Sequence, residues 1–364
     1  MLIKNTPPQS QSNRLLGLDL FRIFLAVLIY AFHSYIHLRC QYGVLDKFVW
    51  EGAVAMTGFF LLSGFSLQIS SSKMDFTDVR SLKAFYTKRL ISIMPLYFFV
   101  HILKMFWENN EPLVNRVLMF PIQTLGIQSQ FSTLFNHTHN EGTWFISCLL
   151  ASYFVFPLMH TILDKLNVKQ SLVLLFVLVF VLLWSPFVQI FVGTNDIYDN
   201  PFFRFLEFSI GMILYKLWER MRDNKKFVRV FNWPIVIVVT VLLIVSISIA
   251  YSIGIPGYYM LYSWSALPCF IIMILCLANL KIPKLQDSIA IRYASSISYA
   301  FFLAQSVGSW TFSKGIIKLT GIDNNLFNIA ISFVLCSIIS VLMYELIQKP
   351  ASIFLKSKFL MSAQ

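Results

Sequence analysis

Apolar segments long enough to cross a lipid bilayer recur along the whole chain. A helix of about 20 apolar residues spans the roughly 30 Å hydrocarbon core of a membrane. Such segments fall at residues 16–37, 49–70, 88–107, 142–161, 170–192, 201–218, 231–253, 258–278, 293–313 and 326–348. Only 13% of the residues are charged, about half the share of soluble domains. The sequence therefore predicts an all-α, polytopic membrane protein of about ten transmembrane helices.

The distribution of basic residues predicts the orientation of these spans. If the N-terminus is cytoplasmic, 21 of the 29 Lys and Arg residues fall in inner segments and five in outer ones. The positive-inside rule then places both termini in the cytoplasm, as expected for a multi-pass protein of the cell (plasma or inner) membrane. The net charge of +12 follows this asymmetry, so we read it as orientation in a lipid bilayer and not as a nucleic-acid surface.

The first span carries three ionisable residues, which are costly in a bilayer and usually functional. Arg22 and His33 are eleven residues apart, or three helical turns plus about 20°, so they share one face about 16 Å apart along the axis. Asp19 precedes Arg22 by three residues, and we expect these two to form an ion pair. The alternative is a snorkelling Arg22 and a His33 bonded to a backbone carbonyl; both interpretations stay open.

Other polar residues interrupt the second, third and sixth spans. Ser63 lies in a small-residue stretch of the second span, where the alternative to a ligand site is close helix packing. Lys88 and Arg89 open the third span, where they also fit simple positive-inside anchoring. Arg204 and Glu207 stand at i,i+3 in the sixth span, as a functional or a self-neutralising pair. A polar stripe in the ninth span contains Ser295, Ser296, Ser298, Gln305, Ser306 and Ser309.

These residues match a set of motifs in the same order along the chain. The set comprises Arg22-x10-His33, the segment Phe59–Phe65 (FFLLSGF), the basic stretch with Lys88, Arg89, Pro95 and Tyr97, Trp144, the segment Arg204–Gly211 (RFLEFSIG), and Lys349-Pro350. With these motifs the chain resembles, over nearly its whole length, the membrane acyltransferase-3 family of integral-membrane O-acyltransferases. Members of that family modify sugars of cell-surface polysaccharides.

The resemblance implies a single transmembrane acyltransferase domain over residues 15–350, between cytoplasmic tails at 1–14 and 351–364. It also implies acyl-CoA, by default acetyl-CoA, as the donor substrate with no bound cofactor, and a sugar or lipid-linked polysaccharide as the acceptor. We expect no metal site and no nucleic-acid partner, and the sequence does not specify an oligomeric state. Transfer would be direct, with His33 as general base, or would pass through an acyl-His33 intermediate.

Roles for the polar residues follow from the resemblance. The expected catalytic residues are His33, Glu207 and Arg204; the expected acyl-CoA-binding residues are Arg22, Lys88, Arg89 and Ser63; and Trp144 is expected on the acceptor side. One position departs from the family pattern, because Gln305 stands where members often have a histidine. The alternative functions are a secondary transporter or flippase, which also uses intramembrane charges, and a non-catalytic partner in polysaccharide export.

Overall fold

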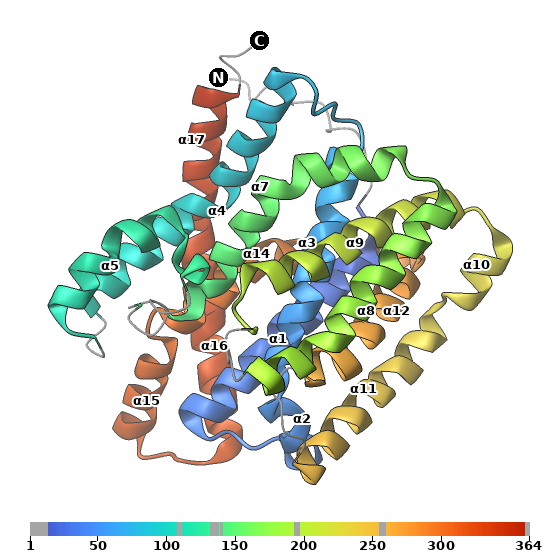
Figure 1. The fold of residues 1–364 in the computed structure, drawn as a ribbon. Helices are drawn as coiled ribbons and strands as arrows, with labels where there is room; N and C mark the ends of the chain where they lie inside the picture. Colours follow the sequence, from blue (N-terminus) through green and yellow to red (C-terminus); the bar gives the residue numbers. More distant parts are fainter. Residues whose placement is uncertain are drawn as a thin grey trace.

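The protein is helical throughout the part of the chain that the computed structural model describes. That part comprises residues 14–107, 111–131, 138, 141–192, 197–254 and 260–360, and it contains no strand. Long helices form a central bundle, and shorter helices connect them (Figure 1). Helices α5 and α15 lie at one edge of the bundle, and α10 and α11 lie at the opposite edge (Figure 1). The predicted all-α membrane fold is confirmed.

Eight of the described helical segments are long and apolar enough to span a membrane. Five of them are single helices: α1 (Leu16–Leu38), α4 (Val79–Trp107), α7 (Trp144–Lys165), α8 (Val168–Val192) and α11 (Trp233–Ile253). The other three are longer than the α-helices within them: Gly52–Ser71 contains α3 (Ala55–Ser71), Leu261–Ala278 contains α12 (Leu267–Ala278), and Asn325–Phe359 contains α16 (Asn325–Met343) and α17 (Lys349–Phe359). Each overlaps a predicted span, although α4 begins nine residues before the predicted 88–107 and the last segment ends eleven residues after the predicted 326–348. The shorter helices are α2 (Asp46–Trp50), α5 (Leu113–Leu125), α10 (Lys225–Val230), α13 (Pro283–Gln286) and α15 (Ser309–Thr320).

The two other predicted spans correspond to more polar helices, α9 (Pro201–Met221) and α14 (Ile289–Ser306). Most of α9 is buried, because it packs against α3, α7, α8 and α12. Its charged residues Arg204, Glu207 and Lys216 are therefore surrounded by protein. An apolar surface is needed only where a helix meets lipid, which explains why α9 is less hydrophobic than its neighbours.

The predicted span at 293–313 is not continuous, which corrects the sequence-based expectation. Helix α14 ends at Ser306, and α15 begins at Ser309. Between them Gly308 has a φ of 90°, in the left-handed region that glycine adopts without steric cost. The sequence pattern missed this break because apolar residues continue across it.

Helices α3 and α9 cross with their backbones in contact, through one glycine on each helix. A Cβ on Gly64 would lie 1.9 Å from the carbonyl oxygen of Phe208, and a Cβ on Gly211 would lie 1.9 Å from that of Leu61. Only glycine permits such an approach. The two glycines come from separate sequence motifs, and the structure shows that they form one helix crossing.

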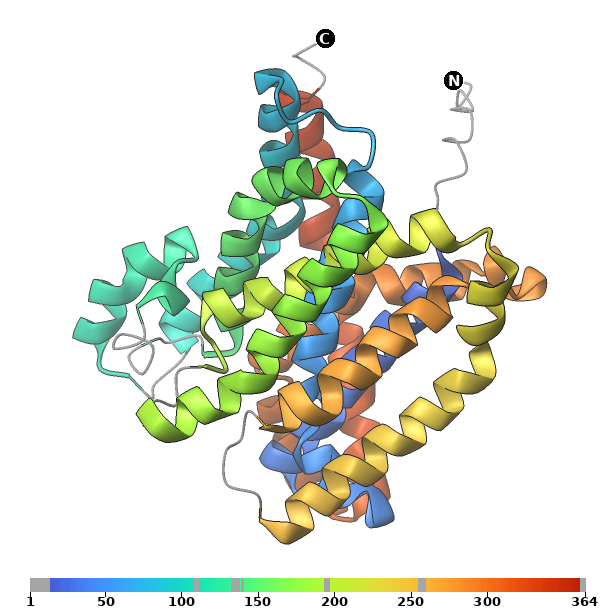
Figure 2. The ribbon, with the colours of Figure 1, turned by 45° about the vertical axis from the view of Figure 1, so that its right-hand side comes forward.

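The outward-facing helices are apolar on their exposed surfaces. Phe176 of α8 is 70% exposed and Ile237 of α11 is 57% exposed, and both helices lie on the outside of the bundle in Figure 2. This surface is suited to hydrocarbon, in agreement with a membrane-embedded protein. The interior, in contrast, contains charged residues such as Asp19 of α1 and Arg204 and Glu207 of α9.

Candidate functional site

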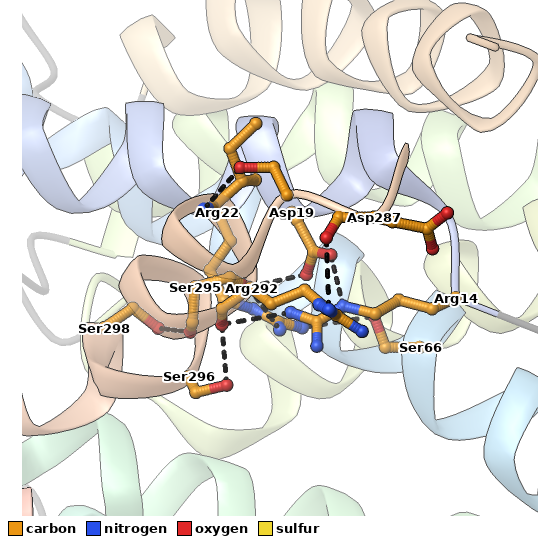
Figure 3. Close-up of polar contacts among 11 residues, drawn as sticks. Arg14, Asp19, Arg22, Ser66, Asp287, Arg292, Ser295, Ser296 and Ser298 are labelled. Carbon is orange, nitrogen blue, oxygen red and sulfur yellow. Dashed lines mark hydrogen bonds and ion pairs between the residues drawn. The ribbon is translucent and has the colours of Figure 1, made fainter. Parts of the chain in front are cut away.

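Arg22 lies on α1 where that helix faces α3 and α14. Its Nη1 donates to Ser295 Oγ at 3.3 Å and its Nη2 donates to Ser66 Oγ at 3.4 Å (Figure 3). Charge-assisted hydrogen bonds in proteins are usually 2.7–2.9 Å long. The guanidinium group is thus held loosely, by two neutral hydroxyls.

The expected ion pair between Asp19 and Arg22 is wrong. The carboxylate of Asp19 instead forms an ion pair with Arg14 and accepts a hydrogen bond of 2.6 Å from Ser295 Oγ (Figure 3). Arg14 reaches Asp19 because it lies on the segment just before α1, where its side chain folds back over the first turn. Arg22 therefore keeps a positive charge that no carboxylate of the described chain contacts within ion-pair distance.

An open cavity of about 430 Å³, which we call the vestibule, lies at the N-terminal end of α1. Its polar lining comprises Arg14, Asp19, Arg22, Ser66, Ser70 and Ser296. Arg89 adds a third guanidinium at its edge, because its Nη2 donates to Ser70 Oγ at 3.4 Å. Several guanidinium groups around one carboxylate favour a polyanionic ligand such as a phosphate ester.

A second cavity, which we call the chamber, has a volume of about 200 Å³ and shares Arg22 with the vestibule. It extends along α3 from Ser63 to Met56, away from the vestibule, and most of its wall is aromatic or aliphatic. Ser63 and Tyr153 also line it, and neither hydroxyl is hydrogen-bonded within the described residues. The chamber thus offers an apolar wall with a few polar groups, as small-molecule sites do.

His33 lies next to the chamber but does not line it. Phe302, which does line the chamber, packs edge-on to the His33 ring at a centroid distance of 6.5 Å. His33 Nδ1 is 2.6 Å from Gln305 Oε1, one helical turn beyond Phe302 on α14. Phe302 therefore contacts both the chamber and His33.

Arg204 lies in a closed cage that lines neither cavity. Its Nη1 donates to both carboxylate oxygens of Glu207, at 3.1 and 2.9 Å, and its Nε donates to the Tyr198 carbonyl at 2.7 Å. Four aromatic rings surround its guanidinium at centroid distances of 4.9–5.6 Å: those of Tyr198, Trp144, Tyr262 and Phe60. Arg204 is fully buried, and Glu207 is 2% exposed.

Six of the eight predicted site residues do not line a cavity. One of them, Arg89, lies at the edge of the vestibule through its bond to Ser70. His33 is behind Phe302, Lys88 is exposed on α4, and Arg204, Glu207 and Trp144 belong to the cage. The cage meets the chamber at Phe60, whose ring contacts Arg204 on one side and lines the chamber on the other. The structure brings together Arg22 and Ser63 at the chamber, with Arg89 at the vestibule.

Arg14 and Tyr153 are among the residues at the cavities that were not singled out from the sequence. Arg14 precedes the first span and resembles any juxtamembrane basic residue, so its position gave no signal. Tyr153 lies within the apolar fourth span, where a tyrosine is common in a protein core. Only their positions in the folded chain, at the vestibule and the chamber, distinguish them.

In a comparison with models of known protein families, residues 15–345 match the acyltransferase domain of the acyltransferase-3 type. The match extends from the start of α1 through α16, so it includes both cavities except for Arg14 at the vestibule and Gln348 at the chamber. No curated protein and no solved structure matches the chain.

Proposed function

The chain belongs to the acyltransferase-3 family, and from this premise we propose that it transfers an acyl group, by default acetyl, from cytoplasmic acyl-CoA to a hydroxyl of a cell-envelope polysaccharide sugar. One observation supports this proposal most directly. Arg22 lies where a basic vestibule meets an apolar chamber, and the far wall of that chamber contacts His33 through Phe302. An anionic head and a long, weakly polar arm, as in acyl-CoA, fit this arrangement.

The vestibule binds the phosphates of the donor in this proposal. Arg22 and Arg89 form weak bonds with serine hydroxyls, which phosphate oxygens would replace with stronger charge-assisted ones. Arg14 keeps Asp19 neutralised, so the carboxylate does not repel the ligand. Lys88 is exposed on α4, and we assign it to membrane anchoring and not to donor binding.

The pantetheine arm enters the chamber and carries the thioester toward His33. Ser63 and Tyr153 present hydroxyls without hydrogen-bond partners among the described residues, which suits the amide groups of the arm. The 16 Å or so between Arg22 and His33 along α1 is a distance that an extended arm of this kind covers. Phe302 turns aside to admit the acyl group.

His33 acts as a general base in the transfer. The acceptor oxygen attacks the thioester carbonyl carbon while His33 Nε2 takes the hydroxyl proton. The carbon–sulfur bond then breaks, and the imidazolium returns the proton to the departing thiolate, which leaves as CoA. The products are an ester and free CoA, and His33 is restored to its neutral form.

Arg204, Glu207 and Trp144 support the chamber wall in this proposal. Their cage encloses the ion pair of Arg204 with Glu207 and adjoins the chamber at Phe60. We further propose that both termini are cytoplasmic, which agrees with the excess of Lys and Arg at that side. The vestibule then opens to the compartment that contains acyl-CoA.

The experiment uses cells that express wild type, His33→Ala, Arg22→Ala or Lys88→Ala at matched membrane levels. We expect O-acetyl groups on the envelope polysaccharide to be lost with His33→Ala and Arg22→Ala and retained with Lys88→Ala. Purified wild type should also release CoA from acetyl-CoA when polysaccharide is present. If acetylation is unchanged in the His33 and Arg22 variants but polysaccharide export is impaired, the acyltransferase proposal is wrong and a transporter function takes its place.

A further inference from the structure

Gln305 is placed at a break in the ninth predicted span, directly against His33. It is the penultimate residue of α14, and it is only 3% exposed. Its Nε2 donates to the carbonyl of Phe301, one turn earlier, at 3.3 Å. This bond turns the amide so that Oε1 points at His33 Nδ1, which is 2.6 Å away.

The orientation of the amide determines the tautomer of His33. A carbonyl oxygen has only lone pairs to offer, so the ring nitrogen that faces it must carry the hydrogen. Nδ1 is therefore protonated in the neutral ring, and Nε2 has the free lone pair. No described residue is hydrogen-bonded to Nε2, so this nitrogen can accept a proton from a substrate.

The remaining surroundings of His33 are aromatic. Phe32, Phe302 and Trp310 lie at centroid distances of 5.2, 6.5 and 6.5 Å from its ring. The nearest titratable group is His37, one turn further along α1 at 5.9 Å, and Lys104 of α4 and Lys314 of α15 act electrostatically on His37. Among the described residues, no carboxylate contacts His33, so Gln305 alone orients it, and it does so without a negative charge.

We propose that Gln305 is a positioning residue that holds His33 in the Nδ1-protonated form and directs Nε2 toward the acceptor hydroxyl. This role rests on the proposed acyl transfer. It matches the part that a buried carboxylate plays for the histidine of a hydrolase triad, where the wrong tautomer removes most of the rate. A neutral amide fixes the same tautomer without drawing a proton onto the ring, so His33 stays a base in an apolar site.

The first test measures the tautomer directly and needs no turnover. Full-length protein labelled with ¹⁵N-histidine is reconstituted in lipid, and His33→Gln identifies the His33 nitrogen signals. We expect wild type and Gln305→Glu to carry the hydrogen on Nδ1, because both offer an acceptor oxygen. Gln305→Met, which has the same length but no acceptor, should lose this preference. A wild-type ring protonated at Nε2, or an unchanged ring in Gln305→Met, overturns the proposal.

The second test compares kinetics of acetyl transfer for the same matched pair. Gln305→Met should lower kcat roughly 10- to 100-fold, which is a part of the about 10²- to 10⁴-fold that general-base catalysis typically contributes. The KM for acetyl-CoA should stay within about twofold, because the phosphates bind at the vestibule. Gln305→Glu should keep kcat within about tenfold and move the rising limb of the pH–rate profile to higher pH, since a carboxylate stabilises the imidazolium.

If Gln305 had only a structural role, its substitution would not change the kcat or the pH–rate profile in the way described above. If Gln305→Met keeps the wild-type kcat and pH profile, the positioning role is wrong. The two proposals also fail separately. Wild type that consumes no acetyl-CoA overturns the acyl transfer, whereas the tautomer measurement upholds or overturns the orientation of His33 by Gln305 in either case.

Discussion

Two arginines, Arg22 and Arg204, occupy the membrane-spanning part of this protein in opposite ways. Arg204 is fully buried, paired with Glu207 and surrounded by four aromatic rings. Arg22 is half-buried, makes only two long hydrogen bonds to serine hydroxyls, and lines two cavities. The same residue type is thus a part of the packed core in one place and a candidate ligand-binding group in the other.

The difference lies in how completely each charge is compensated. Arg204 has carboxylate and carbonyl partners in contact, and these offset part of the free-energy cost of burying its charge. Its removal leaves Glu207 as an uncompensated buried charge, so it should affect stability. An arginine with weak neutral partners can exchange them for phosphate oxygens, so its removal should affect binding.

The largest effect is expected from Arg204→Met. Loss of one partner of a buried ion pair typically costs about 3–5 kcal/mol, and we expect a marked fall in the melting temperature of the purified protein in detergent. Arg204→Met combined with Glu207→Gln should recover part of this loss, because no buried charge is left. A single variant that melts like wild type but has lost acetyl transfer would show that Arg204 contacts substrate.

Arg22→Gln should weaken donor binding and leave the fold intact. Hydrogen bonds to a charged group contribute about 1.5–3 kcal/mol, so the KM for acetyl-CoA should rise about 10- to 100-fold. The melting temperature should stay close to that of wild type. A fall in melting temperature as large as that of Arg204→Met would contradict the distinction between the two arginines.

The α3–α9 crossing, which carries the Arg204 cage, should be sensitive to one methyl group. Gly211→Ala places a Cβ 1.9 Å from the Leu61 carbonyl oxygen, and overpacking of this kind costs about 1–3 kcal/mol. Gly315→Ala is the matched control, because a Cβ at Gly315 on α15 meets no atom within 4 Å. Thermal unfolding that responds equally to the two substitutions would argue against the close crossing.

The neighbouring residues Lys88 and Arg89, in the first half of α4, are expected to show the smallest difference. Arg89→Gln should raise the KM for acetyl-CoA about two- to fivefold, the size expected of a partly exposed ion pair, and the effect should shrink in high salt. Lys88→Gln should change it by less than about 1.5-fold, since the Lys88 side chain is exposed and lines neither cavity. Equal effects of the two substitutions on the KM would show that Arg89 does not contribute to donor binding at the vestibule.

Much of the fold could be predicted from the sequence, because each membrane span is specified by a continuous run of neighbouring residues. An apolar run of about 20 residues must form a helix in hydrocarbon to satisfy its own backbone. For the same reason, the spacing of Arg22 and His33 places them on one face of α1 whatever surrounds that helix. The break at Gly308 was missed, since hydropathy does not report backbone conformation.

The sequence by itself determined the helices, their apolar and polar faces, and the family to which their motifs belong. Only the tertiary structure decided which partner each charge has: Arg14 rather than Arg22 for Asp19, a closed cage for Arg204, and Gln305 for His33 across 272 positions of the chain. The physical reason is that helical periodicity depends on neighbours within a turn or two. Charge compensation depends instead on side chains that only the packing of distant helices brings together.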